Sequence, residues 1–132
     1  MAETFLCFEV ESSLFLIPLS AVFHIVPGVC DEEGMVAFKG QRIESRDLYA
    51  LMTGTSSRER SYAVLMQTGG QYSGLYADQI AGVYELPDGM IFAMPEEVRG
   101  EKNGFLKAAA YVETLKSWAF LIDAELLMEK ER

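Results

Sequence analysis

Residues Val36 to Leu48 read VAFKGQRIESRDL, and this stretch decides the fold of the chain. Apolar residues in it (Val36, Phe38 and Ile43) have the spacing of short strands, and Gly40 interrupts them. Glycine has no Cβ and accepts the backbone angles of a sharp connection between strands, although an ordinary turn glycine explains it equally well. The stretch therefore predicts strands that are joined at Gly40.

The same stretch opens the only net-basic region of an acidic protein. The 132-residue chain has a formal net charge of −9, whereas residues 36–66 carry five basic and three acidic side chains. A basic region steers an acidic partner, although a solvated loop beside one charged sheet face explains the same pattern. The overall charge argues against nucleic acid and against anionic membrane surfaces as partners.

The uncharged run from Leu14 to Val29 is the segment closest to a membrane span. It is shorter than the roughly 20 residues that a spanning helix needs, and Pro18 and Pro27 interrupt it. The residues before it are acidic, whereas a signal peptide begins with positive charge. We therefore expect no direct membrane insertion and a cytoplasmic protein, in which Cys7 and Cys30 remain thiols.

The rest of the chain alternates short apolar segments with turns. These segments predict strands over residues 4–10, 14–17, 62–67, 72–77, 80–86, 105–112 and 118–122. Residues 19–26 fit a short helix or a strand equally well. Asp47 and Asp123 stand where helix caps are expected, before helical segments over 48–52 and 124–130. Many short strands with little helix predict an all-β fold with a short C-terminal helix.

Three segments resemble the CheW-like domain family, the adaptor fold of bacterial chemotaxis. Residues 36–48 are similar to the family's strand, Asn-Leu-Arg-Gly turn and apolar strand that ends in Asp-Leu. Residues 74–86, GLYADQIAGVYEL, are similar to its Gly-x-x-x-Asp-x-[Val/Ile]-x-x-Val pattern. Residues 121–127, LIDAELL, are similar to its Leu-Asp-x-x-x-Leu ending. The three segments occur in the family's order, and the resemblance covers nearly the whole chain.

The resemblance implies one CheW-like domain over residues 1–132, built of two small SH3-like five-stranded barrels packed together. The expected lobes are residues 14–66 and 67–122. The N-terminal strand and the C-terminal helix are expected to pack across both lobes.

Four residues are expected to carry the structural motif of the family. Asp78 follows an apolar strand, and we expect it to accept backbone N–H bonds that close the next turn. Gly82 is expected to mark a bulge or a tight bend at a barrel corner. Gly74 opens the second matching segment, and Asp123 is expected to cap the C-terminal helix.

The resemblance also implies a non-enzymatic scaffold that couples the regulatory domain of a CheA-type histidine kinase to the cytoplasmic tip of a chemoreceptor. No cofactor or metal is expected, because the two cysteines and one histidine lack the spacing of a zinc site. No nucleophile motif of a hydrolase is present in the sequence either. The residues expected to contact a partner are Val36, Phe38, Lys39, Gly40, Arg42 and Glu44, with His24 beside them.

Three of these positions depart from the family pattern. His24 stands where the family usually has Glu, Lys39 where it has Arg, and Glu44 where it has Pro. The family's opposite-charge pair at the first two positions therefore cannot form here. One alternative is a divergent paralogue that binds only one of the two partners. Another, from a different class, is a small β-barrel that carries an apolar ligand, which length and strand content allow.

Overall fold

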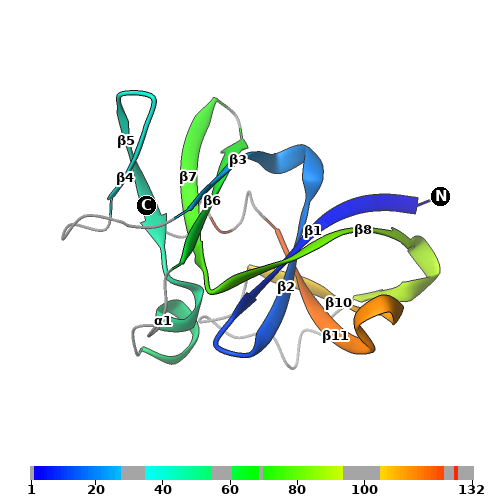
Figure 1. Cartoon of the computed structure of the whole chain (residues 1–132). Helices are drawn as coiled ribbons and strands as arrows, with labels where there is room; N and C mark the ends of the chain where they lie inside the picture. The colour runs from blue at the N-terminus through cyan, green and yellow to red at the C-terminus, as the bar shows by residue number, and fades with distance from the viewer. Residues whose placement is uncertain are drawn as a thin grey trace.

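The computed structural model describes residues 2–27, 35–54, 61–68, 70–93, 105–123 and Leu127. Most of these residues lie in strands, which form two sheets packed against each other (Figure 1). Within these ranges, no helix has the length and apolar character that crossing a membrane requires. The predicted all-β fold class is confirmed.

The larger sheet contains six strands in the order β8-β1-β2-β11-β10-β9. Their bounds are β1 Ala2–Val10, β2 Ser13–Pro18, β8 Gln79–Pro87, β9 Ile91–Ala93, β10 Leu106–Val112 and β11 Ser117–Ile122. β2 and β11 pair in parallel, and the other neighbours pair antiparallel. The first and the last strands of the chain therefore lie in one sheet.

The smaller sheet contains five strands in the order β3-β6-β7-β5-β4. Their bounds are β3 Val22–Pro27, β4 Met35–Phe38, β5 Gln41–Arg46, β6 Tyr62–Thr68 and β7 Gln71–Ala77. A 3-10 turn, η1 (Leu19–Ala21), leads into β3, and the helix α1 (Leu48–Thr53) follows β5. Residues 19–26 therefore form a turn followed by a strand, which their periodicity alone did not decide.

The approximate lobe boundary expected between residues 66 and 67 falls inside β6. β6 pairs with β7 from Tyr62↔Ala77 to Thr68↔Gln71, so both strands belong to the five-stranded sheet. β2, expected in the first lobe, pairs with β1 and β11 in the other sheet. The pairing of β2 with β11 joins distant parts of the chain, and local sequence patterns carry no signal for it.

The six-stranded sheet has one strand more than the five that were expected for each barrel. The additional strand is β9 (Ile91–Ala93), which pairs with β10 from Ala108↔Ala93 to Ala110↔Ile91. A strand of three residues is too short to show an alternating apolar pattern, and the sequence therefore gave no prediction for it.

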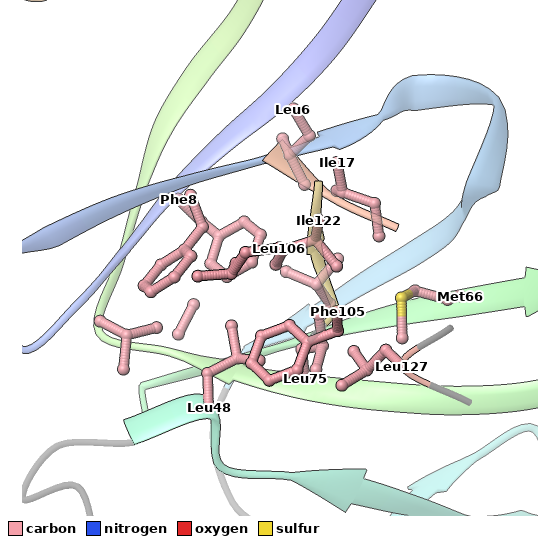
Figure 2. Packing of buried hydrophobic residues seen from close by; sticks show 14 residues of the cluster. Leu6, Phe8, Ile17, Leu48, Met66, Leu75, Phe105, Leu106, Ile122 and Leu127 are labelled. Carbon is pink, nitrogen blue, oxygen red and sulfur yellow. The ribbon is translucent and has the colours of Figure 1, made fainter. Parts of the chain in front are cut away.

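The main hydrophobic cluster lies between the two sheets (Figure 2). Its side chains come from both sheets, from α1 and from the C-terminal segment, and they include Leu6, Phe8, Ile17, Leu48, Met66, Leu75, Phe105, Leu106, Ile122 and Leu127. Burial of this much apolar surface at the contact between the sheets is the dominant force that holds them together. One continuous core therefore supports both sheets.

Two smaller clusters lie on the other faces of the sheets. One contains Val36, Ile43, Ala63, Leu65 and Tyr76 from the five-stranded sheet. The other contains Phe5, Cys7, Leu16, Leu86, Ala108, Ala110, Val112, Ala119 and Leu121 from the six-stranded sheet. Central strands such as β1 and β6 are thus buried on both faces, which explains their nearly continuous apolar sequences.

The two predicted caps have different outcomes. Asp47 caps α1 as predicted, because its Oδ1 accepts a hydrogen bond from the Ala50 N–H at 3.2 Å. The N–H of Leu127 donates to the carbonyl of Asp123 at 3.0 Å, which is one helical hydrogen bond. The other positions of the C-terminal helix predicted over residues 124–130 lie outside the described residues, so that helix stays a prediction.

Candidate partner-binding surfaces

The connection between β4 and β5 is a tight two-residue turn. Lys39 and Gly40 both have positive φ angles, 48° and 79°. Positive φ at both positions is typical of a type I′ turn, whose twist matches that of the two flanking strands. The sharp connection predicted at Gly40 is confirmed, and it leaves Lys39 exposed at the tip of the hairpin.

The hairpin places the predicted contact residues on different faces. Val36 lies opposite Ile43, and both side chains point into the core. Val36 is only 2% exposed, so the prediction that it contacts a partner does not fit the structure. Its apolar character serves the core, and a strand pattern cannot tell a core face from a binding face. Arg42 and Glu44 are exposed and lie on the opposite face of the hairpin.

Aromatic side chains gather where β3, β4 and β7 approach one another, and we call this group, Phe23, His24, Phe38 and Tyr72, the aromatic rim. The Phe23 ring centroid lies 5.5 Å from that of Phe38 and 5.1 Å from that of Tyr72. The His24 ring lies 4.7 Å from the Phe38 ring. Phe23 and Tyr72 are 41% and 39% exposed, so the rim is an apolar surface open to solvent.

A bulge in β3 places Phe23 and His24 of the rim at the surface. The pairing of β3 with β6 shifts register between Val22 and His24, and Phe23 is the additional residue. A bulge redirects side chains, and here Phe23 and His24 are both exposed although they are consecutive. Both contact Phe38 of β4, which lies at the other end of the strand order. The rim contacts therefore bring the two edges of the five-stranded sheet together.

Sequence reasoning identified only half of the rim. His24 and Phe38 were among the predicted residues, whereas Phe23 and Tyr72 were missed. Tyr72 was assigned to a strand without a role, and Phe23 lies in the segment whose structure the periodicity left undecided. The available signal was the adjacent pair Phe23-His24, because two consecutive ring side chains do not both reach the core from a regular strand.

His24 and Lys39 both lie next to the Phe38 ring. The Nζ of Lys39 lies 5.5 Å from the centroid of the Phe38 ring, and the His24 ring contacts the same ring. A cation over an aromatic face is attracted by the ring quadrupole. Phe38 therefore contacts both residues at the positions where the family has its opposite-charge pair.

Gly74 is required by a close approach between β5 and β7. Ser45 lies opposite Gly74 in this parallel pair, and both residues are buried. A Cβ built on Gly74 would overlap the Oγ of Ser45 and would lie 3.3 Å from a methyl group of Leu65. Any larger side chain at position 74 must therefore displace a neighbour.

Asp78 stabilises a turn, although not the one expected. Its Oδ2 accepts a hydrogen bond of 2.7 Å from the backbone N–H of Glu11, which lies in the turn between β1 and β2. Its own N–H donates to the carbonyl of Glu9 at 2.8 Å. Glu11 and Ser12 have positive φ angles of 48° and 69°, so this bond supports an unfavourable backbone conformation. The next turn along the chain was the wrong location, because Glu11 is distant in sequence.

Gly82 marks the predicted bulge. The register between β1 and β8 shifts between Cys7↔Gly82 and Phe8↔Ile80, and Gly82 has a φ of 138°. A Cβ at this position would also lie 3.2 Å from the hydroxyl of Tyr84. The chain passes from the five-stranded sheet at β7 to the six-stranded sheet at β8, and the bulge lies near the start of β8.

Arg46 anchors the C-terminal segment. Its Nη1 donates to the carbonyl oxygen of Leu127 at 3.0 Å, and Leu127 is buried in the main cluster. The three polar residues that end β5 therefore have different positions: Glu44 is exposed, Ser45 faces Gly74, and Arg46 bonds to the carbonyl oxygen of Leu127.

A second exposed aromatic group lies on the six-stranded sheet. We call it the β9–β11 cluster, and it contains Phe92, Tyr111 and Trp118. The ring centroids of Phe92 and Tyr111 lie 5.8 Å and 5.6 Å from that of Trp118. Phe92 and Trp118 are 50% and 54% exposed. None of the three was singled out from the sequence, because each lies in a short segment interpreted only as a strand or a loop.

Potential metal ligands and the thiol of Cys7 are the remaining reactive groups among the described residues. Within the described ranges, no three His, Cys, Asp or Glu side chains lie close enough together to hold a metal ion. Cys7 is fully buried, and burial, together with the nearby Glu9 carboxylate, raises its pKa to about 11. Its sulfur is therefore a neutral thiol at physiological pH and a poor nucleophile.

Comparisons with known proteins agree with this architecture. Residues 4–132 match the family model of the CheW-like domain. A comparison with curated proteins found no match. Among solved structures, the crystal structure of the scaffolding protein TtCheW from Thermoanaerobacter tengcongensis is similar, with a TM-score of 0.75 and 20% identity. The alignment covers 92% of this chain and 84% of that chain.

The two sheets correspond to the two SH3-like barrels of that fold, as predicted from the sequence. The family match extends over nearly the entire chain, from β1 to the C-terminal residue. The protein therefore belongs to the CheW-like domain family.

Proposed function

We propose that this chain is a non-enzymatic, cytoplasmic scaffold of bacterial chemotaxis-type signalling that couples a CheA-type histidine kinase to chemoreceptors. Membership of the CheW-like domain family over residues 4–132 supports the proposal, as does the likeness to a protein described as a scaffolding protein. The observation that carries it is the aromatic rim, an exposed apolar surface beside the basic hairpin tip.

The rim has the composition of a protein-binding surface. Aromatic side chains are enriched at binding hot spots, where a few apolar anchors are surrounded by polar residues. Phe23, Phe38 and Tyr72 supply such anchors, and Lys39 supplies a positive charge at their edge. We assign this surface to the regulatory domain of the kinase, with an acidic side chain of the partner facing Lys39.

Arg42 and Glu44 belong to a separate candidate contact. Both are exposed on the face of the β4–β5 hairpin opposite the rim. One partner cannot cover the rim and this face with a single flat surface. We therefore propose this outer face, with Gly40 at the turn, as the contact for the chemoreceptor tip.

A carrier of an apolar ligand is the weaker alternative. The interior of the five-stranded barrel is occupied by side chains such as Ile43, Leu65 and Tyr76, which are nearly inaccessible to solvent. The six-stranded barrel is likewise occupied by Phe5, Cys7 and their neighbours. Small barrels whose interiors are filled by side chains have no room for a ligand there.

The kinase contact is tested by retention of the purified kinase regulatory domain on the immobilised chain. Phe38→Asp and Phe23→Ser are expected to abolish or strongly reduce retention, because each removes an apolar anchor. Val83→Ser is the matched control, since Val83 is also an exposed apolar residue (53%) but lies outside the rim. Unchanged retention after both rim substitutions would remove the rim from consideration.

The receptor contact needs its own titration with a receptor tip fragment. Arg42→Glu is expected to weaken this binding and to leave retention of the kinase domain intact. If the wild-type chain binds the kinase domain but not the receptor fragment, the chain is a one-partner paralogue. Comparable affinity for both partners would exclude that alternative.

A further inference from the structure

A cleft opens at one end of the six-stranded barrel, away from the aromatic rim. Its volume is about 320 Å³, which is within the range of sites that bind a single side chain or a small molecule. It lies between the end of β8, the 3-10 turn η2 (Asp88–Met90) and the junction of β10 with η4 (Glu113–Leu115). The residues that line it are Tyr84, Glu85, Leu86, Pro87, Met90, Tyr111, Val112, Glu113 and Thr114.

The lining combines negative charge with aromatic surface. Glu85 and Glu113 are exposed residues of the lining, one on β8 and one on η4. Tyr84 and Tyr111 are also lining residues, and the hydroxyl of Tyr84 donates to the carbonyl of Ala81 at 3.1 Å. Carboxylates next to aromatic rings favour a cation, because both attract positive charge. None of the described residues that line the cleft is a Lys or Arg that would compete.

The cleft is continuous with the β9–β11 cluster. Tyr111 lines the cleft and its ring also contacts the ring of Trp118, which in turn contacts Phe92. An acidic cleft therefore adjoins a strip of exposed aromatic surface on the same barrel. A partner that carries a basic side chain beside an apolar one would contact both parts at once.

We propose that the cleft and the β9–β11 cluster form a second binding site, which accepts a protein segment carrying a Lys or Arg side chain next to an apolar side chain. The basic group enters between Glu85 and Glu113, and the apolar group packs on Trp118 and Phe92. The charge complementarity selects a basic occupant, and the net charge of −9 favours its approach. The site lies on the other barrel from the aromatic rim and does not depend on the kinase contact.

Trp118 is a built-in reporter for this site, because it is the only tryptophan of the chain. The probe is an acetylated and amidated hexapeptide of alternating leucine and arginine, and the comparison peptide carries glutamate in place of arginine. The arginine peptide is expected to change the Trp118 fluorescence in a saturable manner, and the glutamate peptide is not. Binding is expected to weaken at about 0.5 M salt, where the Debye length is about 4 Å.

Substitutions then test the role of the two carboxylates. The double substitution Glu85→Gln and Glu113→Gln is expected to weaken binding of the arginine peptide by about tenfold, and each single one by about threefold. Glu9→Gln is the matched control, because it removes the same charge at the other end of β1: Glu9 pairs with Gln79, whereas Thr4 pairs with Glu85. Circular dichroism verifies that the double variant is folded.

A second measurement is needed for the case in which the arginine peptide binds without changing the Trp118 fluorescence. The anisotropy of a dye-labelled arginine peptide reports binding directly and needs no response from Trp118. The proposal is overturned if neither readout detects binding, if the glutamate peptide binds equally well, or if the double variant binds like the wild type. Loss of kinase retention in the rim variants, with peptide binding intact, would keep the two proposals separate.

Discussion

Each barrel of this protein exposes one group of aromatic side chains. The two groups differ in the charge of the residues beside them and in whether their contacts help to hold the barrel together. The aromatic rim lies beside Lys39, whereas the β9–β11 cluster adjoins Glu85 and Glu113. Rim residues join β3 to β4, which are not neighbours in the sheet, so their contacts help to close a barrel. Rings of the β9–β11 cluster lie on strands that backbone hydrogen bonds already hold together.

The comparison teaches that exposed aromatic residues are not equivalent. Substitution in the rim affects both barrel closure and any surface presented to a partner, whereas substitution in the β9–β11 cluster affects the surface alone. The opposite charges also allow the two surfaces to select different partners, because like charges repel a wrong partner. Both surfaces keep their shape only while the main hydrophobic cluster between the barrels is intact.

The largest expected effect comes from that shared core. Phe8→Ala is expected to lower the free energy of unfolding by about 3–5 kcal/mol, because Phe8 is fully buried between the two sheets. Phe92→Ala, at an exposed position, is expected to change it by less than about 0.5 kcal/mol. Urea unfolding followed by Trp118 fluorescence and by far-UV circular dichroism should give coincident transitions. Two separate transitions would show that the barrels unfold independently.

The next effect concerns the turn between β1 and β2. Asp78→Ala is expected to lower the free energy of unfolding by about 2–3 kcal/mol, because the N–H of Glu11 loses a charged acceptor at 2.7 Å. Asp78→Asn keeps an oxygen acceptor and is expected to cost less. Equal losses in the two variants, measured by urea unfolding, would contradict a role of the charge.

A smaller effect is expected in the five-stranded barrel. Gly74→Ala is expected to cost about 1–2 kcal/mol, because the new Cβ would overlap the Oγ of Ser45. Addition of Ser45→Ala should restore most of the loss, which a double-mutant cycle measures. Gly89→Ala is the control, since a Cβ there meets no atom within 4 Å. A Gly74→Ala variant as stable as the control would refute the close approach.

Burial of the Cys7 thiol inside the six-stranded barrel is tested by the pH dependence of the free energy of unfolding. Burial raises the pKa of Cys7 to about 11, above its value in the unfolded chain. The folded state therefore holds the thiol proton more tightly, and this stability is present below the unfolded pKa and is lost as pH rises towards 11. Between about pH 8 and pH 10 the loss is about 1 kcal/mol. Cys7→Ala should reduce the pH dependence by that amount, and an unchanged dependence would argue against burial of the thiol.

The smallest expected effect is a coupling energy between two rings, which should be larger in the aromatic rim than in the β9–β11 cluster. A double-mutant cycle of Phe23→Leu and Phe38→Leu is expected to give a coupling energy of about 0.5–1 kcal/mol in urea unfolding, because these rings meet edge to face. The corresponding cycle of Phe92→Leu and Trp118→Leu, followed by circular dichroism, should give a smaller value. A larger coupling energy in the second cycle would contradict the conclusion that the rim contacts, and not those of the β9–β11 cluster, help to hold a barrel together.

Much of the local structure was predictable from the sequence. Gly40 indicated the β4–β5 turn, Asp47 the cap of α1, and Gly82 the bulge in β8, because each depends on backbone geometry or on bonds within a few residues. The apolar face of β4 was also visible in the pattern. The pattern did not show that Val36 serves the core, because an apolar strand residue looks the same on a core face and on a binding face.

The candidate surfaces were only partly predictable. His24 and Phe38 were identified, whereas Phe23, Tyr72, Phe92 and Trp118 were not. Exposure of Phe23 accompanies the bulge in β3, and Phe92 lies on β9 at the edge of its sheet. The bulge in β3 has one local signal, the adjacent rings of Phe23 and His24, whereas the edge position of β9 has none.

Local sequence alone indicated the all-β class, the turn at Gly40, the cap of α1 and the resemblance to the CheW-like domain, since propensity, periodicity and glycine positions act locally. The tertiary structure alone decided which strands share a sheet, that Asp78 supports the turn at Glu11, and that Phe23 and Tyr72 join His24 and Phe38. These features arise from contacts between residues far apart in the chain. Their free energy comes from burial and pairing that exist only when both sheets have formed.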